Sequence, residues 1–206
     1  MKHILQYCLI FMAASSITVL DANALEFQLG KKDALQILLL KGKFVDGDSG
    51  RFSEALRRAG RVDEIWFDSP GGSVLEGMEI GRKIRNAQLA TRVPNGSVCA
   101  SICAFAFLGG VLRQVDPGSK FVVHMFSMAG DEDFVKKVET VIKQKGPAGA
   151  MAVIMFIEQS SAKVARMQAD YLLEMSISLR LLFPNYDTEH TEGYVLSRAE
   201  MASYNV

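Results

Sequence analysis

The chain has 206 residues, 49% hydrophobic and 22% charged, and its 23 Lys and Arg residues balance its 23 Asp and Glu residues. This length and apolar content are sufficient for one domain with a substantial core. Because the net charge is zero, nothing in the composition supports a nucleic-acid partner or binding to an anionic membrane surface.

The first 24 residues have the layout of a secretory signal peptide. Basic Lys2 precedes an apolar stretch over residues 4–20, and the small-x-small triplet Ala22-Asn23-Ala24 follows. We therefore expect cleavage after Ala24, a periplasmic or secreted location, and no membrane attachment of the mature chain. An uncleaved anchor is the alternative, since the apolar stretch is close to the lower length limit of a membrane span.

Residues 25–206 have the pattern of a single domain in which strands alternate with helices. The pattern predicts strands over residues 35–44, 64–68, 89–93 and 120–126. It predicts helices over residues 52–59, 73–88, 101–108, 131–145, 148–174 and 198–203, with a Pro184-centred loop before the last of them. This alternation is typical of βαβ units, so we expect an α/β fold with a mainly parallel sheet flanked by helices.

Few metal-binding side chains follow residue 24. The cysteines are Cys99 and Cys103, and the histidines are His124 and His190. No four-ligand zinc spacing can be assembled from them locally. We therefore predict neither a metal site nor a cofactor.

The segment 68–73, Asp-Ser-Pro-Gly-Gly-Ser, lies between a predicted buried strand and a helix. Its two glycines let the backbone turn sharply and approach a ligand closely. Their N–H groups, free of a strand ladder, can point at an oxyanion. An ordinary strand-to-helix turn explains the same residues.

Ser101 begins an otherwise apolar predicted helix. A helix N-terminus offers free N–H donors and a positive dipole end, so a nucleophile there gains oxyanion stabilisation from the next amide. Serine is also a preferred N-cap, which is the alternative interpretation.

His124 lies in an apolar predicted strand and must find a partner or be destabilising. Such a histidine is usually a core residue, but here it is the leading candidate for a general base.

Three segments and their order resemble the Clp protease proteolytic subunit, in particular the exported ClpP-like branch of the ClpP/crotonase superfamily. They are Ser-Pro-Gly-Gly at 69–72, Cys-Ala-Ser-Ile-Cys at 99–103 with Gly-Gly-Val-Leu-Arg at 109–113, and the strand that carries His124. The resemblance is strongest over residues 64–127. It implies a ClpP/crotonase-like fold of repeated ββα/βαβ units, serine peptidase activity on peptides or proteins, and a homo-oligomer.

The resemblance also implies a role for individual residues. Ser101 matches the nucleophile and His124 the general base, and the amides of Gly72 and Ile102 match the oxyanion hole. Substrate would pair as an added strand with the segment Gly71, Gly72, Ser73, Val74.

The third member of the triad is expected in the tail. Asp187 precedes Leu-Ser-Arg-Ala-Glu at 196–200, which resembles the segment that follows the acid in the family. This alignment requires an insertion near residues 131–147. Asn185 and Asp170 are the competitors, and if none of them reaches His124 the site is a dyad or inert.

A disulfide between Cys99 and Cys103 is disfavoured by helical geometry. Residues four apart in a helix have Cβ atoms about 5–6 Å apart, whereas a disulfide needs about 3.8 Å. We therefore expect two buried thiols, with a bond possible only if Cys99 lies before the helix begins.

Two other functions compete with an exported serine peptidase. One is a catalytically inactive ClpP-like scaffold or peptide-binding protein. The other is a Ser–Lys peptidase resembling signal peptide peptidase A, which the His124 strand argues against. Because exported proteins have no ATP at hand, we expect no ATP-driven partner.

Overall fold

The computed structural model describes residues 24–129 and 131–206. Apart from Ala24, the predicted signal peptide lies outside the described residues. Ala24 forms a parallel bridge with Lys43, and the next side chain, Leu25, is fully buried. The expected cleavage position therefore directly precedes the first buried residue of the described chain.

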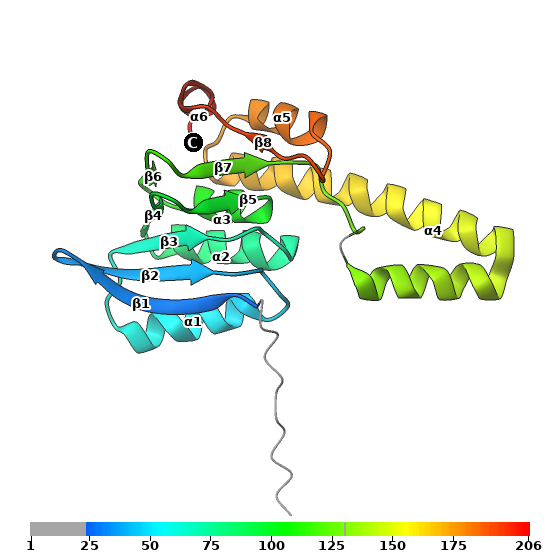
Figure 1. The fold of residues 1–206 in the computed structure, drawn as a ribbon, viewed down its shortest axis with the longest axis horizontal. Helices are drawn as coiled ribbons and strands as arrows, with labels where there is room; N and C mark the ends of the chain where they lie inside the picture. Colours follow the sequence, from blue (N-terminus) through cyan, green and yellow to red (C-terminus); the bar gives the residue numbers. More distant parts are fainter. Residues whose placement is uncertain (1–23, 130) are drawn as a thin grey trace, which may run out of the picture.

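The main sheet contains five strands in the order β1-β2-β3-β4-β6 (Figure 1). They are β1 (Glu26–Lys32), β2 (Leu35–Lys41), β3 (Glu64–Asp68), β4 (Ala90–Val93) and β6 (Arg113–Val115). β1 pairs antiparallel with β2, and the other three pairings are parallel. The expectation of a mixed α/β fold with a mainly parallel sheet is therefore confirmed.

Three helices pack beside one another along this sheet (Figure 1). They are α1 (Asp48–Ala59), α2 (Val74–Asn86) and α3 (Ile102–Leu108). The strands direct alternate side chains, such as Ile65 and Phe67 of β3, into the core. Every residue of α3 is buried, because this helix contacts α2 as well as strands of both sheets.

A second, three-stranded sheet carries the candidate catalytic residues. Its strands are β5 (Val98–Ala100), β7 (Lys120–Val123) and β8 (Tyr194–Val195), in the order β5-β7-β8. β5 and β7 are parallel, with Ala100 opposite Val122. Because parallel strands end at the same edge, the residues that follow β5 and β7 are brought together there.

The long element α4 (Glu132–Glu174) consists of two helices joined at a kink, which confirms the two helices predicted over 131–145 and 148–174. Its halves meet at Gly146, whose φ of 54° and ψ of −136° break the helix. In Figure 1 the halves form a hairpin that projects from the sheets. No helix in residues 24–129 and 131–206 combines the length and apolar character needed to cross a membrane.

Tyr171 of α4 ties this helix to α3. Its hydroxyl donates a 2.8 Å hydrogen bond to the carbonyl of Phe105, and burial raises the pKa of the hydroxyl. The hydroxyl fits because α2 has a glycine opposite, and a Cβ at Gly81 would collide with it. A Cβ at Gly77 would likewise lie 2.5 Å from the Ile102 side chain, so glycines set the close approach of α2.

The tail differs from the predicted loop around Pro184. A 3-10 turn (Leu179–Leu181) runs into α5 (Leu182–Asp187), and α6 (Arg198–Tyr204) ends the fold. Proline is tolerated in the first turn of a helix, where its missing N–H has no intrahelical acceptor.

The strand boundaries also differ from the predictions. β2 ends at Lys41 rather than residue 44, β4 begins at Ala90 rather than 89, and β7 ends at Val123 rather than 126. His124 therefore directly follows its strand instead of lying within it.

Candidate active site

The turn between β5 and α3 holds Ser101 in a rare backbone conformation. Its φ is 58° and its ψ is −127°, in the region that favours glycine. The Ser101 N–H donates to the Val122 carbonyl at 2.9 Å, while its hydroxyl makes no capping hydrogen bond to α3. The alternative of a simple N-cap serine is therefore not realised. A strained strand-to-helix turn is the geometry that presents the nucleophilic serine in α/β-hydrolases.

A cavity of about 60 Å³ lies at this turn. Its lining residues come from the glycine turn and the start of α2, from Ser101 and α3, from the segment that follows β7, and from α4. They are Gly72, Val74, Ser101, Ile102, Phe105, His124, Phe126, Ser127 and Gln168. The structure thus brings together the predicted nucleophile, the predicted base and both predicted oxyanion residues. Phe105, Phe126, Ser127 and Gln168 were not predicted.

Gln168 carries no signal in the sequence that marks it for the site. It is a polar residue within α4, buried to 4% exposure. The hydroxyl of Tyr186 donates to its side-chain oxygen at 2.5 Å, and burial raises the pKa of that hydroxyl. Gln168 is identified as a site residue only by the folded structure, in which α4 lies at the cavity.

Among the backbone N–H groups that line the cavity, those of Gly72 and Ile102 have no hydrogen-bond acceptor within residues 24–129 and 131–206. Phe44 donates to the Gly71 carbonyl at 2.8 Å and accepts from Ser73 at 2.8 Å, so the N–H and C=O of Gly72 face away from Phe44. Ile102 is the first residue of α3, where no intrahelical acceptor exists. Unpaired donors beside a serine hydroxyl can stabilise an oxyanion.

The glycine pair is required by packing as well as by chemistry. Gly71 and Gly72 have φ values of 102° and 140°. A Cβ at Gly71 would lie 2.7 Å from the Ser101 Cβ and 2.8 Å from the Ala100 carbonyl oxygen. A Cβ at Gly72 would collide with the backbone of Phe44. The tight packing agrees with the turn interpretation of this motif, and the same backbone leaves the Gly72 N–H without an acceptor.

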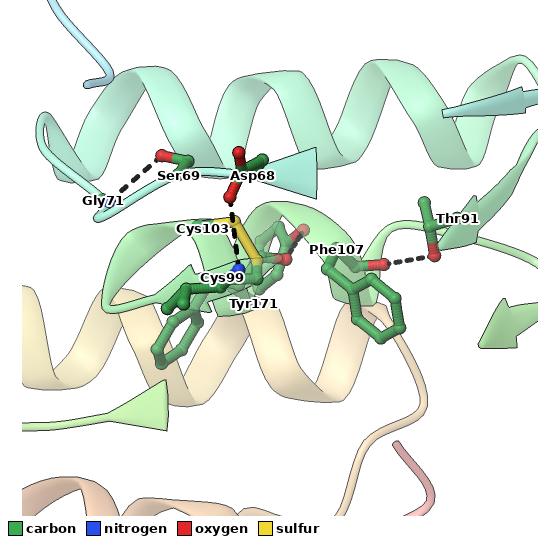
Figure 2. Close-up of a disulfide and its surroundings, with 10 residues drawn as sticks. Asp68, Ser69, Gly71, Thr91, Cys99, Cys103, Phe107 and Tyr171 are labelled. Atoms are coloured by element: carbon green, nitrogen blue, oxygen red, sulfur yellow. Dashed lines mark hydrogen bonds between the residues drawn. A yellow bond between two sulfur atoms is a disulfide. The ribbon is translucent and has the colours of Figure 1, made fainter. Parts of the chain in front are cut away.

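The Asp68–Ser69 segment fixes the glycine turn to β5, as Figure 2 shows beside the disulfide. The Asp68 carboxylate accepts from the Val98 N–H at 3.2 Å, and the hydroxyl of buried Ser69 accepts from the Gly71 N–H at 3.1 Å. The Ser69 carbonyl accepts from the Ala100 N–H at 3.0 Å. These bonds place the two halves of the candidate oxyanion hole in a fixed relation.

His124 is oriented by the backbone. Its Nδ1 lies 2.9 Å from the Met125 carbonyl oxygen, which can only accept. In the neutral imidazole this contact selects the tautomer with the proton on Nδ1, in which Nε2 is the acceptor that a general base requires. No hydrogen bond joins His124 to Ser101 in the described residues. Catalytic hydrogen bonds are often long before substrate binds.

No hydrogen bond or ion pair within the described residues joins His124 to Asp187, Asn185 or Asp170. Asp187 is exposed at the end of α5, although the next carbonyl, that of Thr188, accepts from the Met125 N–H at 3.0 Å. Asn185 is 1% exposed, and neither polar atom of its side chain has a partner. Asp170 pairs with Arg166 at 2.9 Å on the surface of α4.

Cys99 and Cys103 form a disulfide (Figure 2). The expectation of two free thiols is wrong because Cys99 belongs to β5 and lies before α3 begins. The two Cα atoms are 5.2 Å apart, within the range that a disulfide spans. The condition under which a bond was considered possible is therefore met.

A larger groove of about 900 Å³ lies between β1 and α1. Its polar lining includes Glu26, Arg51, Glu54 and Arg58, but no serine, cysteine or histidine. Size alone would favour this groove as a ligand site. We assign the candidate active site to the smaller cavity because the potential nucleophile and base are there.

Compared with known proteins, the chain matches no protein-family model and no curated protein.

Replacing Ser101 tests whether its backbone is strained. A non-glycine residue in this region costs about 1–3 kcal/mol, and glycine gives back about 0.5–1 kcal/mol through its greater freedom in the unfolded chain. We therefore expect Ser101→Gly to be about 1 kcal/mol more stable than Ser101→Ala in urea unfolding. A glycine variant that is less stable than the alanine variant by about 0.5–1 kcal/mol, which is the cost of glycine alone, would show that the conformation carries no strain.

Proposed function

We propose that this protein is a serine hydrolase of the peptidase type, with Ser101 as nucleophile and His124 as general base. One observation carries the proposal: Ser101 adopts a strained strand-to-helix turn at a cavity shared with His124 and two acceptor-free amides. Strained backbone clusters at functional sites, because the surrounding structure must over-determine it.

The proposed chemistry is acyl transfer. Ser101 Oγ attacks the substrate carbonyl carbon while His124 Nε2 takes its proton, and the oxyanion accepts from the N–H groups of Gly72 and Ile102. His124 then gives that proton to the leaving amine, which departs and leaves an acyl ester on Ser101. A water molecule then attacks the carbonyl carbon of this ester while His124 takes its proton. The bond to Ser101 Oγ breaks, His124 returns the proton to Oγ, and the acid product leaves.

We propose Asp187 as the third member of the triad. Its support is local: the carbonyl of the following residue, Thr188, pairs with the residue after His124. A side-chain movement would be needed for contact with the imidazole. Until such a movement, the Met125 carbonyl fills the orienting role at Nδ1, which makes a Ser–His dyad the second possibility.

We propose that an extended peptide pairs with the segment Gly71–Val74. The Gly71 carbonyl and the Ser73 N–H bond to Phe44, whereas Gly72 and Val74 line the cavity. The free side of this segment can therefore receive main chain, with Gly72 serving both docking and the oxyanion hole. Main-chain pairing provides affinity with little side-chain selectivity.

We also propose that the fold is of the ClpP/crotonase type. The support is the succession of parallel strands β2, β3, β4 and β6, separated by helices, and a second small sheet whose strands precede the proposed nucleophile and base.

The inactive scaffold remains the second candidate function. The absence of any hydrogen bond or ion pair between a candidate acid and His124 in the described chain favours it.

Labelling with a fluorophosphonate separates the two candidates. We expect the wild type to label at Ser101 and Ser101→Ala to remain unlabelled. His124→Ala should slow labelling and ester turnover about a thousandfold or more, as for loss of a triad base. His190→Ala, at an exposed position outside the cavity, is the matched control and should match the wild type. A folded wild type that does not label supports the scaffold.

We propose export through residues 1–24. The motivation is the basic, apolar and small-residue layout of this segment, to which the disulfide adds support, because disulfides persist mainly in oxidising compartments. Expression in a bacterium followed by intact-mass measurement of the periplasmic fraction should give a chain that starts at Leu25 or within a few residues. Retention of the full-length chain in the membrane fraction would instead identify an anchor.

We propose that copies of the chain associate through the arm, defined as residues 132–157 of α4. The arm exposes several large apolar side chains along its second half, between the turn at Gly146 and the level of Phe134: Met151, Ile154, Met155, Phe156 and Ile157. Over residues 140–157 the charged side chains are Lys143 and Lys145, whereas acidic residues 131–133 lie at the root. Two arms packed antiparallel would bury the apolar side chains and set tip lysines against root carboxylates.

Sedimentation equilibrium tests this association. We expect the wild type to give a multiple of the chain mass at micromolar concentration and Met155→Glu to dissociate, because a carboxylate buried at the interface is costly. Leu112→Glu places the same charge at a 73% exposed apolar position outside the arm and should leave the mass unchanged. A monomeric wild type would contradict the proposal.

A further inference from the structure

The Cys99–Cys103 disulfide encloses the candidate nucleophile. The bond joins the middle residue of β5 to the second residue of α3, and Ser101 lies midway between the two cysteines. Four extended residue steps would span about 13–14 Å, whereas the cysteine Cα atoms are 5.2 Å apart. The bond therefore holds the chain in a sharp reversal whose centre is Ser101.

Both ends of the bond are anchored in the fold. Cys99 pairs with Phe121 of β7 and forms a bridge with Ser69, and both cysteines are fully buried. Cys103 belongs to the buried helix α3. The three residues between the cysteines consequently have little freedom to leave the observed path.

Few other interactions hold Ser101 in its left-handed conformation. Its N–H donates to Val122, and its carbonyl accepts from the Ala104 N–H at 3.0 Å. Relaxation to negative φ would reorient the peptide between Ser101 and Ile102, and with it the hydroxyl and one of the two proposed oxyanion donors. A covalent link across the turn opposes that relaxation.

The contribution of this bond to overall stability is expected to be small. A disulfide stabilises mainly by restricting the unfolded chain, and the restriction grows with the length of the loop that it closes. Here the cysteines are separated by four positions. The short loop puts the contribution of this bond to global stability at the low end for a disulfide, and its position around a strained serine points to an additional local role.

We propose that the Cys99–Cys103 disulfide positions the Ser101 nucleophile, so that the oxidised protein is the active form. The cysteines are positioning residues and take no part in the reaction. The proposal rests on the proposed hydrolase function, and it extends that function by making turnover dependent on an oxidising environment.

The test compares three forms of the full mature chain: oxidised wild type, wild type reduced by a phosphine, and the double variant Cys99→Ala with Cys103→Ala. Reduction adds two electrons and two protons to the disulfide and yields two thiols, while the phosphine becomes its oxide with oxygen from water. The reduced wild type retains both sulfur atoms, so it separates loss of the bond from loss of buried volume. Intact mass verifies each state.

We expect fluorophosphonate labelling and kcat for a small ester to fall on the order of 10- to 100-fold on reduction, with KM nearly unchanged, because misplacement of a reacting group by about 1 Å can cost that much. Reoxidation should restore both, and the double variant should be equally slow and insensitive to phosphine. Val93→Ala, at a buried position outside the cavity, is the control for general destabilisation. It should lower the melting temperature without lowering kcat.

Hydrogen exchange gives a measurement that does not require activity. On reduction, the Ser101 amide should exchange at least about tenfold faster, while amides of β2 and β3 keep their protection, since local opening is independent of global unfolding. Unchanged kcat and unchanged Ser101 exchange in the reduced protein would overturn the proposal, as would loss of protection throughout the chain. An oxidised wild type that does not label, yet shows the local change in exchange, would reject the hydrolase function and retain the positioning role.

Discussion

The parallel pairing of β5 with β7 is the constraint on which the candidate site depends. Ala100 lies opposite Val122, so both strands end at the same edge, and Ser101 and His124 follow directly. The Ser101 N–H continues the ladder to the Val122 carbonyl before the chain turns into α3. A slip of one residue in this register would move the serine away from the histidine, since successive residues face opposite sides of a strand.

A second turn is fastened to the first by buried polar contacts. Ser69 pairs with β5 through its backbone and holds the Gly71 amide with its hydroxyl, so the glycine turn lies directly against Ser101. The Cys99–Cys103 disulfide spans the turn that contains Ser101 and lies near Asp68 and Ser69 (Figure 2). The strained turn at Ser101 is thus held between the glycine turn, the pairing with β7 and the disulfide, as over-determined active-site geometry requires.

Long, strongly apolar elements were predictable from the sequence, whereas short ones were not. The strand Glu64–Asp68 and the helix α2 have clear patterns, and the Pro-Gly-Gly segment at 70–72 separates them. The strands β5, β6 and β8 have two or three residues, too few to show any period, and exist because distant strands pair with them. β1 is an edge strand with Leu29 exposed, so its alternation is blurred.

The sequence by itself determined which side chains gather at the site: Ser101, His124, Gly72 and Ile102 were identified from strand ends, a helix start and paired glycines, because these signals are local. Only the tertiary structure decided how they act. The left-handed φ of Ser101 arises from pairing with β7, and the disulfide exists because Cys99 pairs as a strand instead of continuing α3. The position of Asp187 relative to His124 was likewise decided by how the tail packs, because residues so distant along the chain are related only through the folded core.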